Sequence, residues 1–225
     1  MKTTCFSLAA FSCLAITLLA AGVNAQEAKP SPFAKWEKEI AALEKQDAPD
    51  AKHEIVFVGS SSIRLWKLDE SFPGLKLLNR GFGGSELADS VHFAPRIVLK
   101  YEPKIVVLYA GDNDLANGKK PEQVAADFVA FEKVVHDKLP KTKIIYVAVK
   151  PSIARWKNIA NVMATNKLIA AECAKDAERL VFLDIAPLML GANGEPDPSL
   201  FVKDGLHLSP AGYAKWNEKL LPLLK

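Results

Sequence analysis

Residues 54–66, Glu-Ile-Val-Phe-Val-Gly-Ser-Ser-Ser-Ile-Arg-Leu-Trp, decide the fold of this chain. The apolar run Ile55–Val58 stops abruptly at Gly59 and three serines, which is the pattern of a short buried strand that ends in a tight turn. Open parallel sheets bind their ligands at the carboxyl ends of their strands, and residues 60–62 would lie at such an end. A serine there is either a nucleophile, if a base and an oxyanion site are near, or a cap of the next helix.

The rest of the chain repeats this alternation of short strands and longer helices. The predicted strands cover residues 54–58, 76–78, 105–109, 143–149 and 180–184, and the predicted helices cover residues 33–46, 62–68, 86–101, 121–139, 158–176 and 210–221. Strands that alternate with helices indicate a parallel sheet that is covered on both faces. We therefore predict an α/β protein, a flavodoxin-like three-layer α/β/α sandwich with a five-stranded parallel sheet.

Composition limits the classes of protein to which the chain can belong. Its 225 residues are 49% hydrophobic and 24% charged, with a formal net charge of +3. This content is enough for one core without a disulfide or metal staple, and Cys173 stands alone once Cys5 and Cys13 leave with the leader described below. The positive charge is spread along the chain without a basic block, so we expect no nucleic-acid partner.

The first 25 residues have the pattern of a targeting segment. Lys2 precedes an almost wholly apolar stretch, and Val23-Asn24-Ala25 is a small-residue cleavage site. We predict a signal peptide over residues 1–25 that is cleaved after Ala25, and a secreted or periplasmic protein; an uncleaved anchor is the alternative. Residues 26–50 would form a tether and a first helix, and residues 51–225 the main domain, with no membrane span in the mature chain.

Three further loops carry chemistry at predicted strand ends. The glycines between Gly81 and Gly84 free backbone amides to face a negative charge. Asn113 can donate to an oxyanion, whereas capping is the preferred role for its neighbours Asp112 and Asp114. His207 can act as a base if Asp204, three residues earlier on the same loop, fixes its tautomer. The other histidines (His53, His92 and His136) have no such neighbour, and we assign them no catalytic role.

In this order, the four segments resemble the SGNH hydrolases, also called the GDSL esterase and lipase family. The matching blocks are Gly59-Ser60-Ser61, Asn79-Arg80-Gly81-Phe82-Gly83-Gly84, Gly111-Asp112-Asn113-Asp114 and Asp204-Gly205-Leu206-His207. The resemblance implies that Ser61 is the nucleophile and that Asp204 and His207 complete a triad. It also implies an oxyanion hole formed by the Ser61 and Gly84 amides and the Asn113 side chain. Ser60 and Ser62 stand where the family name has aspartate and leucine, so the chain is similar to the Gly-Ser-Ser-Ser-Ile variants.

The implied activity is hydrolysis of carboxylic esters by a secreted serine esterase or acylhydrolase, without a metal or organic cofactor. The family's substrates include short-chain acyl esters, lysophospholipids and acetylated sugars, and the chain leaves the choice between lipid and carbohydrate open, as it does the oligomeric state. Arg155 could pair with a substrate anion and Trp156 could stack on a sugar or cover an acyl chain; both could equally brace their loop. An α/β-hydrolase, with Asp184 as the acid, and an inactive secreted binding protein are the alternatives.

Overall fold

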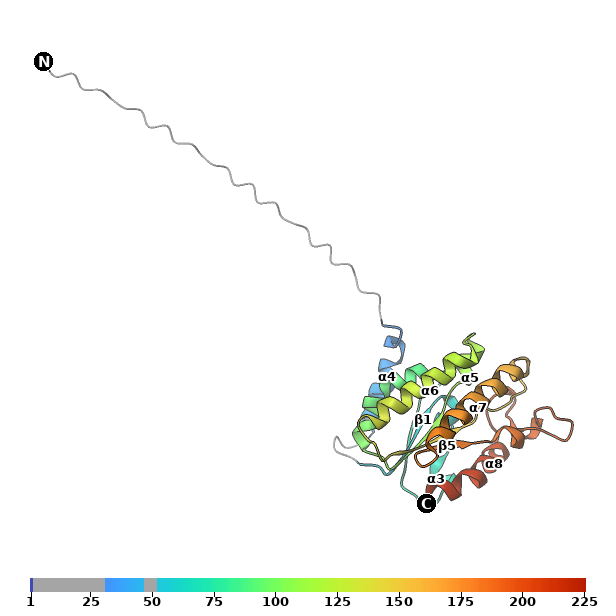
Figure 1. Cartoon of the computed structure of the whole chain (residues 1–225). Helices are drawn as coiled ribbons and strands as arrows, with labels where there is room; N and C mark the ends of the chain where they lie inside the picture. Colours follow the sequence, from blue (N-terminus) through green and yellow to red (C-terminus); the bar gives the residue numbers. More distant parts are fainter. Residues whose placement is uncertain (2–30, 47–51) are drawn as a thin grey trace. The chain divides into compact units, whose positions relative to one another are not determined.

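Five short apolar segments form the sheet at the centre of the protein. A computed structural model describes residue 1 and residues 31–46 and 52–225, and every named element lies in the compact unit Pro32–Lys225 (Figure 1). The strands are β1 (Ile55–Gly59), β2 (Leu77–Gly81), β3 (Ile105–Tyr109), β4 (Lys143–Val147) and β5 (Leu180–Leu183). The predicted signal peptide, its cleavage site and most of the predicted tether lie outside the described residues.

The strand order confirms the predicted topology. All neighbouring strands pair in parallel in the order β2-β1-β3-β4-β5, which is the flavodoxin-like arrangement. The register places Gly59 opposite both Gly81 of β2 and Tyr109 of β3. The turns that follow these three strands therefore begin at the same level, and the polar residues after them are brought to one edge of the sheet.

Successive residues of a strand point to opposite faces of the sheet, and here both sets are apolar. Helices therefore cover both faces. Val56, Val106 and Ile144 pack on one face with helices α1 (Glu37–Glu44), α4 (Leu87–Ile97), α6 (Pro121–His136) and α7 (Ile159–Cys173). Phe57, Val107 and Ile145 pack on the other face with helices α2 (Ser61–Arg64), α3 (Leu68–Ser71) and α8 (Pro210–Leu220). Figure 1 shows α4, α6 and α7 on one side of the sheet and α3 and α8 on the other.

Short helical turns complete the connections. The remaining α-helix is α5 (Asp112–Ala116), and the 3-10 helices are η1 (Ala34–Trp36), η2 (Leu99–Tyr101), η3 (Trp156–Asn158), η4 (Ala174–Asp176), η5 (Ala186–Met189), η6 (Pro198–Leu200) and η7 (Leu221–Leu224). Several of these 3-10 turns take up the ends of longer predicted helices, as at residues 99–101 and 174–176. Within the described part of the chain, no helix is both long enough and apolar enough to cross a bilayer.

The first helix lies within the compact unit Pro32–Lys225 and packs on its core. Ile40 of α1 is fully buried in the core on the α4 side of the sheet. The Trp36 ring, just before α1, meets the Phe82 ring edge to face at a centroid distance of 5.4 Å. Phe82 follows β2 directly, so the N-terminal helix braces the turn in which the glycine-rich loop begins.

Candidate active site

Ser61 is placed by a turn that only glycine can make. Gly59 ends β1 with a φ of +135°, and a Cβ there would lie 1.9 Å from the carbonyl oxygen of Tyr109. The next amide, that of Ser60, donates to the same Tyr109 oxygen at 3.0 Å. Ser60 is extended and serves as the N-cap, so Ser61 becomes the first residue of α2. The strand thus delivers the Ser61 side chain to the carboxyl edge of the sheet.

The structure brings Ser61, His207 and Asp204 together. Nε2 of His207 lies 2.9 Å from Oγ of Ser61, although the two residues are 146 positions apart. Nδ1 of His207 lies 2.6 Å from Oδ2 of Asp204. The imidazole therefore links a hydroxyl to a carboxylate through its two ring nitrogens, the arrangement that lets a histidine act as a general base.

Asp204 is held in its own loop by backbone amides. Its Oδ1 accepts from the amides of Leu206 at 2.8 Å and His207 at 2.9 Å. Gly205, with a φ of +66°, allows this tight turn. The hydrogen bond from His207, together with these amides, lowers the pKa of Asp204 to about 2, so the carboxylate is ionised at neutral pH.

The last helix fastens the histidine loop to the serine turn. Tyr213 of α8 donates its hydroxyl hydrogen to the backbone oxygen of Ser62 at 2.8 Å. Nε1 of Trp66 donates to Oδ1 of Asn217, also on α8, at 2.9 Å. These bonds, made by residues six and ten positions after His207, fix the distance between the loop and α2.

The glycine-rich segment lies beside the serine, but it begins later than predicted. Asn79, Arg80 and Gly81 were expected in a loop and instead form the end of β2. The polar Asn79 is accommodated in the strand because its Nδ2 donates to the backbone oxygen of Ile63 at 2.7 Å and its Oδ1 accepts from the Gly81 amide. The turn proper contains Gly84, whose φ is +80°.

Asn113 stands next to this turn. The segment Gly111–Asp114 was expected to be a tight loop, and it is the start of helix α5, with Gly111 as an N-cap at a φ of +113°. Nδ2 of Asn113 donates to the backbone oxygen of Ser85 at 2.9 Å. This bond ties the Asn113 amide to the residue that follows Gly84, so the two predicted oxyanion donors lie on segments in direct contact.

Comparison with known proteins gives the family. The profile of the GDSL-like Lipase/Acylhydrolase family matches residues 64–215, more than half of the chain. The chain belongs to this family. It is therefore a hydrolase of ester substrates. The matched segment contains Gly84, Asn113, Asp204 and His207 and begins three residues after Ser61. No curated protein matches the chain.

Solved structures share its fold. A protein from Streptococcus pneumonia, provisionally named as a platelet activating factor, superposes with a TM-score of 0.76 at 18% identity, covering 86% of this chain and 94% of that one. A provisionally assigned acylhydrolase from Bacteroides fragilis gives 0.69 at 20% identity, covering 88% and 98%. A GDSL-like lipase from Bacteroides thetaiotaomicron gives 0.68 at 20% identity, covering 86% and 97%.

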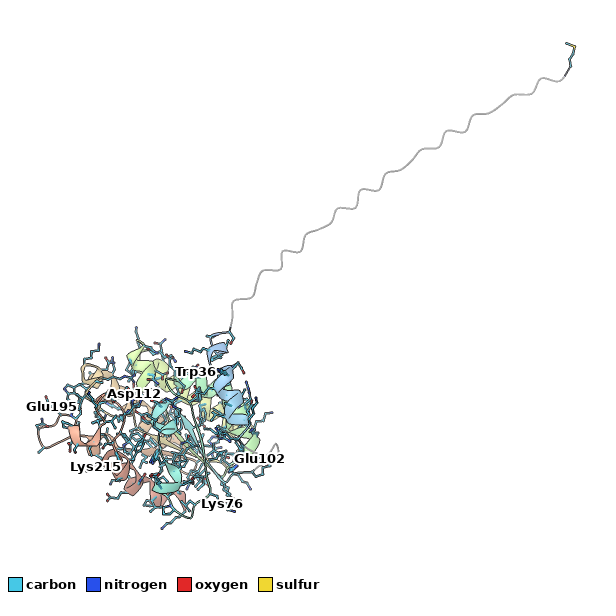
Figure 2. The ribbon with its side chains drawn as sticks, turned by 180° about the vertical axis from the view of Figure 1, so that it is seen from behind. Trp36, Lys76, Glu102, Asp112, Glu195 and Lys215 are labelled. Atoms are coloured by element: carbon cyan, nitrogen blue, oxygen red, sulfur yellow. The ribbon has the colours of Figure 1, made fainter. Side chains whose placement is uncertain are left out.

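This GDSL-family chain has a cluster of charged side chains next to Asn113, formed by Asp112, Lys150 and Arg155. Asp112 was expected to cap or turn, but its carboxylate is buried and accepts from Nζ of Lys150 at 2.9 Å and from the Tyr109 hydroxyl at 3.3 Å. Figure 2 labels Asp112 within the body of the domain. Burial alone would raise the pKa of Asp112, but the charges of Lys150 and Arg155 outweigh it and hold the pKa below its ordinary value.

Arg155 is engaged by protein groups. Its Nη1 lies 2.5 Å from Oδ1 of Asp112 and its Nη2 lies 2.9 Å from Oδ1 of Asn113. Of the two roles considered for this residue, binding a substrate anion and bracing the loop, these contacts support bracing. Trp156 begins η3 directly after it and is partly buried.

The other residues considered for the site have local partners. Asp114 accepts from the Leu87 amide at the start of α4 and from Nζ of Lys119 at 2.9 Å, so it caps a neighbouring helix. Asp184 accepts from the Ala186 amide at 3.1 Å, whereas the carboxylate at His207 is that of Asp204. The remaining histidines contact Phe33 (His92), Tyr101 (His53) and the Thr142 oxygen (His136).

Sequence reasoning missed Lys150 and Tyr109. Tyr109 is the last residue of β3, and Lys150 comes directly after the apolar run that contains β4. A lone lysine that closes a buried strand is unusual, because a buried ammonium needs a charged partner. That signal pointed to a buried counter-ion.

In the described part of the chain, no group of three or more acidic, histidine or cysteine side chains is placed to hold a metal ion.

Proposed function

We propose that this protein is a secreted serine esterase that cleaves carboxylic esters through an acyl-enzyme on Ser61, with His207 as base and Asp204 as its partner. The observation that carries the proposal is the continuous pair of hydrogen bonds from Ser61 Oγ to His207 Nε2 at 2.9 Å and from His207 Nδ1 to Asp204 Oδ2 at 2.6 Å. A serine hydroxyl is a weak nucleophile until such a base takes its proton.

The reaction takes place in two halves. His207 removes the proton from Ser61 Oγ as this oxygen attacks the ester carbonyl, and the ionised Asp204 stabilises the imidazolium. The imidazolium then gives its proton to the leaving alcohol as the ester C–O bond breaks, which leaves an acyl-serine. A water molecule, deprotonated by His207, attacks the acyl carbon and releases the acid, and Ser61 recovers its hydrogen.

The oxyanion of each tetrahedral intermediate would be bound by three donors. These are the backbone amides of Ser61 and Gly84 and the Nδ2 of Asn113. Neither backbone amide has a hydrogen-bond acceptor within residues 31–46 and 52–225. Asn113 uses one of its two amide hydrogens on Ser85, so the second stays available. Donors that are fixed in advance stabilise the developing charge without reorganisation.

Exposure of the catalytic groups favours small or water-exposed esters as substrates. The side chains of His207 and Asp204 are 28% and 48% exposed, so the carboxylate face of the site opens to solvent. Short-chain acyl esters, lysophospholipid-like esters and acetylated sugars meet this condition. The names of the structural neighbours, a platelet activating factor, an acylhydrolase and a lipase, are in keeping with this range.

Secretion is the second part of the proposal and rests on residues 1–25. The basic start, the apolar stretch and the small residues before Gln26 form a signal-peptide pattern. N-terminal sequencing of the exported protein should give Gln26 as the first residue. An intact Met1 in the exported fraction would show instead that the segment is retained as an uncleaved anchor.

The test of catalysis uses p-nitrophenyl acetate, butyrate and octanoate with the wild type, Ser61→Ala and Ser60→Ala. We expect Ser61→Ala to lose ~10⁴-fold or more in kcat, as loss of a triad nucleophile does. Ser60→Ala, which alters the neighbouring N-cap side chain, should keep its turnover. A fluorophosphonate probe should label the wild type at Ser61. Turnover in Ser61→Ala would exclude this nucleophile, and a wild type that neither reacts with the probe nor hydrolyses esters would be a binding protein.

A further inference from the structure

A buried cluster of charges adjoins the predicted oxyanion site. Lys150 and Asp112 are 2% and 6% exposed, and Lys150 also lies 3.0 Å from the Tyr109 hydroxyl and 3.4 Å from Oγ of Ser62. Burying an ammonium and a carboxylate costs free energy even when they pair. Lys150 lies beside Ser62, the residue after the predicted nucleophile, and Asp112 directly precedes Asn113, so the position of the cluster suggests a role at the site.

Arg155 connects the cluster to Asn113. One guanidinium nitrogen meets Oδ1 of Asp112 at 2.5 Å, and the other meets Oδ1 of Asn113 at 2.9 Å. A guanidinium holds its nitrogens in a rigid planar fork, so fixing one of them on Asp112 also fixes the direction of the other. Asp112 is itself anchored by Lys150, and Arg155 therefore presents a fixed donor to the Asn113 carbonyl.

These contacts decide which way the Asn113 amide points. Its oxygen accepts from Arg155 and its nitrogen donates to the Ser85 oxygen at 2.9 Å. A rotated amide would set its NH2 against the guanidinium and its oxygen against another carbonyl oxygen, which removes both bonds and creates two repulsions. The observed orientation keeps the second N–H beside the Gly84 turn.

The same contact also strengthens the donor. A cation at the amide oxygen withdraws electrons from the amide, which makes the N–H a better partner for a negative oxygen. Lys150 and Arg155 carry two positive charges against the one negative charge of Asp112, so the three groups leave a net positive charge next to the place where the oxyanion forms. This field favours the transition state over the neutral ester.

We propose that Arg155, held by Asp112 and through it by Lys150, is a positioning residue that orients and polarises Asn113 for oxyanion binding. The inference rests on the esterase function proposed above. Arg155 touches no reacting atom in this scheme; it acts through Asn113. Its removal should therefore lower kcat for neutral esters and leave KM nearly unchanged.

The experiment is a double-mutant cycle on full-length protein with p-nitrophenyl acetate. We expect Arg155→Met to lower kcat ~10–100-fold and Asn113→Ala ~10²–10³-fold, the usual effect of losing an oxyanion donor. In the Asn113→Ala background, Arg155→Met should cost less than ~3-fold more, because coupled residues are not additive. Arg155→Lys keeps the charge without the fork and should recover only part of kcat. Lys157→Met removes an exposed cation two positions away and should match the wild type.

Each alternative gives a different result. Additive losses in the cycle would overturn the proposal, and thermal melting of every variant shows whether a loss comes from unfolding. If Arg155 instead binds a substrate anion, Arg155→Met would raise KM for a p-nitrophenyl hemisuccinate ester and leave the neutral acetate unaffected. Activity that persists in Ser61→Ala would overturn the esterase mechanism itself. Loss in Ser61→Ala with wild-type kinetics in Arg155→Met would overturn this inference alone.

Discussion

Asp204 holds His207 through both its side chain and its backbone. One carboxylate oxygen lies 2.6 Å from Nδ1 of the ring, and the other accepts from the His207 amide at 2.9 Å. Because the pKa of Asp204 is lowered to about 2, the carboxylate is an acceptor at assay pH, and Nδ1 must carry the hydrogen. In the neutral imidazole that acts as the base, Nε2 carries no hydrogen and faces the Ser61 hydroxyl as an acceptor.

Asp204→Asn should lower kcat by ~10²–10⁴ with little change in KM, because a neutral amide neither selects this tautomer nor stabilises the imidazolium. Steady-state kinetics on p-nitrophenyl acetate measures the effect. Asp184→Asn is the matched control, since Asp184 bonds the Ala186 amide. A loss of turnover in Asp184→Asn with retention in Asp204→Asn would show that Asp184 is the acid.

Asp112→Asn should destabilise the fold by ~3–5 kcal/mol, because it leaves the buried Lys150 ammonium without its counter-charge. The companion change Lys150→Met, made in the same chain, should recover part of this loss by removing the unpaired charge. Urea unfolding followed by tryptophan fluorescence gives the free energies. Equal stability of Asp112→Asn and the wild type would show that Lys150 finds another partner.

The stability difference between wild type and Asp112→Asn should depend on pH. The pKa of Asp112 is lower in the folded protein than its ordinary value of 3.8, so the unfolded chain binds more protons in the interval below that value. The contribution of Asp112 is therefore complete above about pH 4 and declines as the pH falls. Urea titrations at pH 6, 4 and 3 should show the difference shrinking, and a constant difference would contradict the linkage.

Gly59→Ala should prevent normal folding, since the new Cβ would lie 1.9 Å from the Tyr109 oxygen, where the ends of β1 and β3 pair. Gly74→Ala provides the control: its φ of +85° is also positive, but nothing lies within 4 Å of the added carbon. That substitution should cost only ~1 kcal/mol from backbone strain. Soluble yield and melting temperature compare the two, and similar values would show that the strand can shift to admit a methyl group.

Cys173 should be unreactive in the folded protein. Burial raises the pKa of its thiol to about 12, and the side chain is 3% exposed, so almost no accessible thiolate exists at pH 8. A thiol-reactive chromogenic disulfide should detect no difference between wild type and Cys173→Ala before denaturation, and one extra thiol in the wild type afterwards. A difference in the native proteins would indicate local opening of the α7 end.

The sequence predicted the presence of the strands better than the residues at which they begin and end. Residues 105–109 form a strand with the predicted bounds, because a run of five apolar residues between turn residues has the length of a buried strand and is too short for a typical helix. By contrast, β2 extends through Asn79 and Arg80, whose polar side chains suggested a loop. Arg80 is buried, and its Nε donates a hydrogen bond to the Tyr101 hydroxyl oxygen at 3.0 Å. Partners that lie far along the chain made these polar residues compatible with a strand, and no local pattern shows such partners.

The same distinction applies to the site. The four motifs were expected at one edge of the sheet, and the structure brings Ser61, His207, Asp204 and Asn113 to that edge through the parallel topology. The role of Asp112 was misread because its partners Lys150 and Arg155 lie 38 and 43 positions away. Turn chemistry is local and visible in a sequence, whereas a buried ion pair depends on which strands become neighbours.

The separation between Ser61 and His207 has a consequence for refolding. The Asp204–His207 pair can form within one short loop, but the serine joins it only when a segment 146 positions later has docked. Docking of α8 places the Trp216 ring against Trp66 at a centroid distance of 5.4 Å. Recovery of turnover after dilution from denaturant should therefore coincide with the change in tryptophan emission. We therefore expect a partly folded chain to leave esters intact and hydrolysis to begin only when the whole fold is complete.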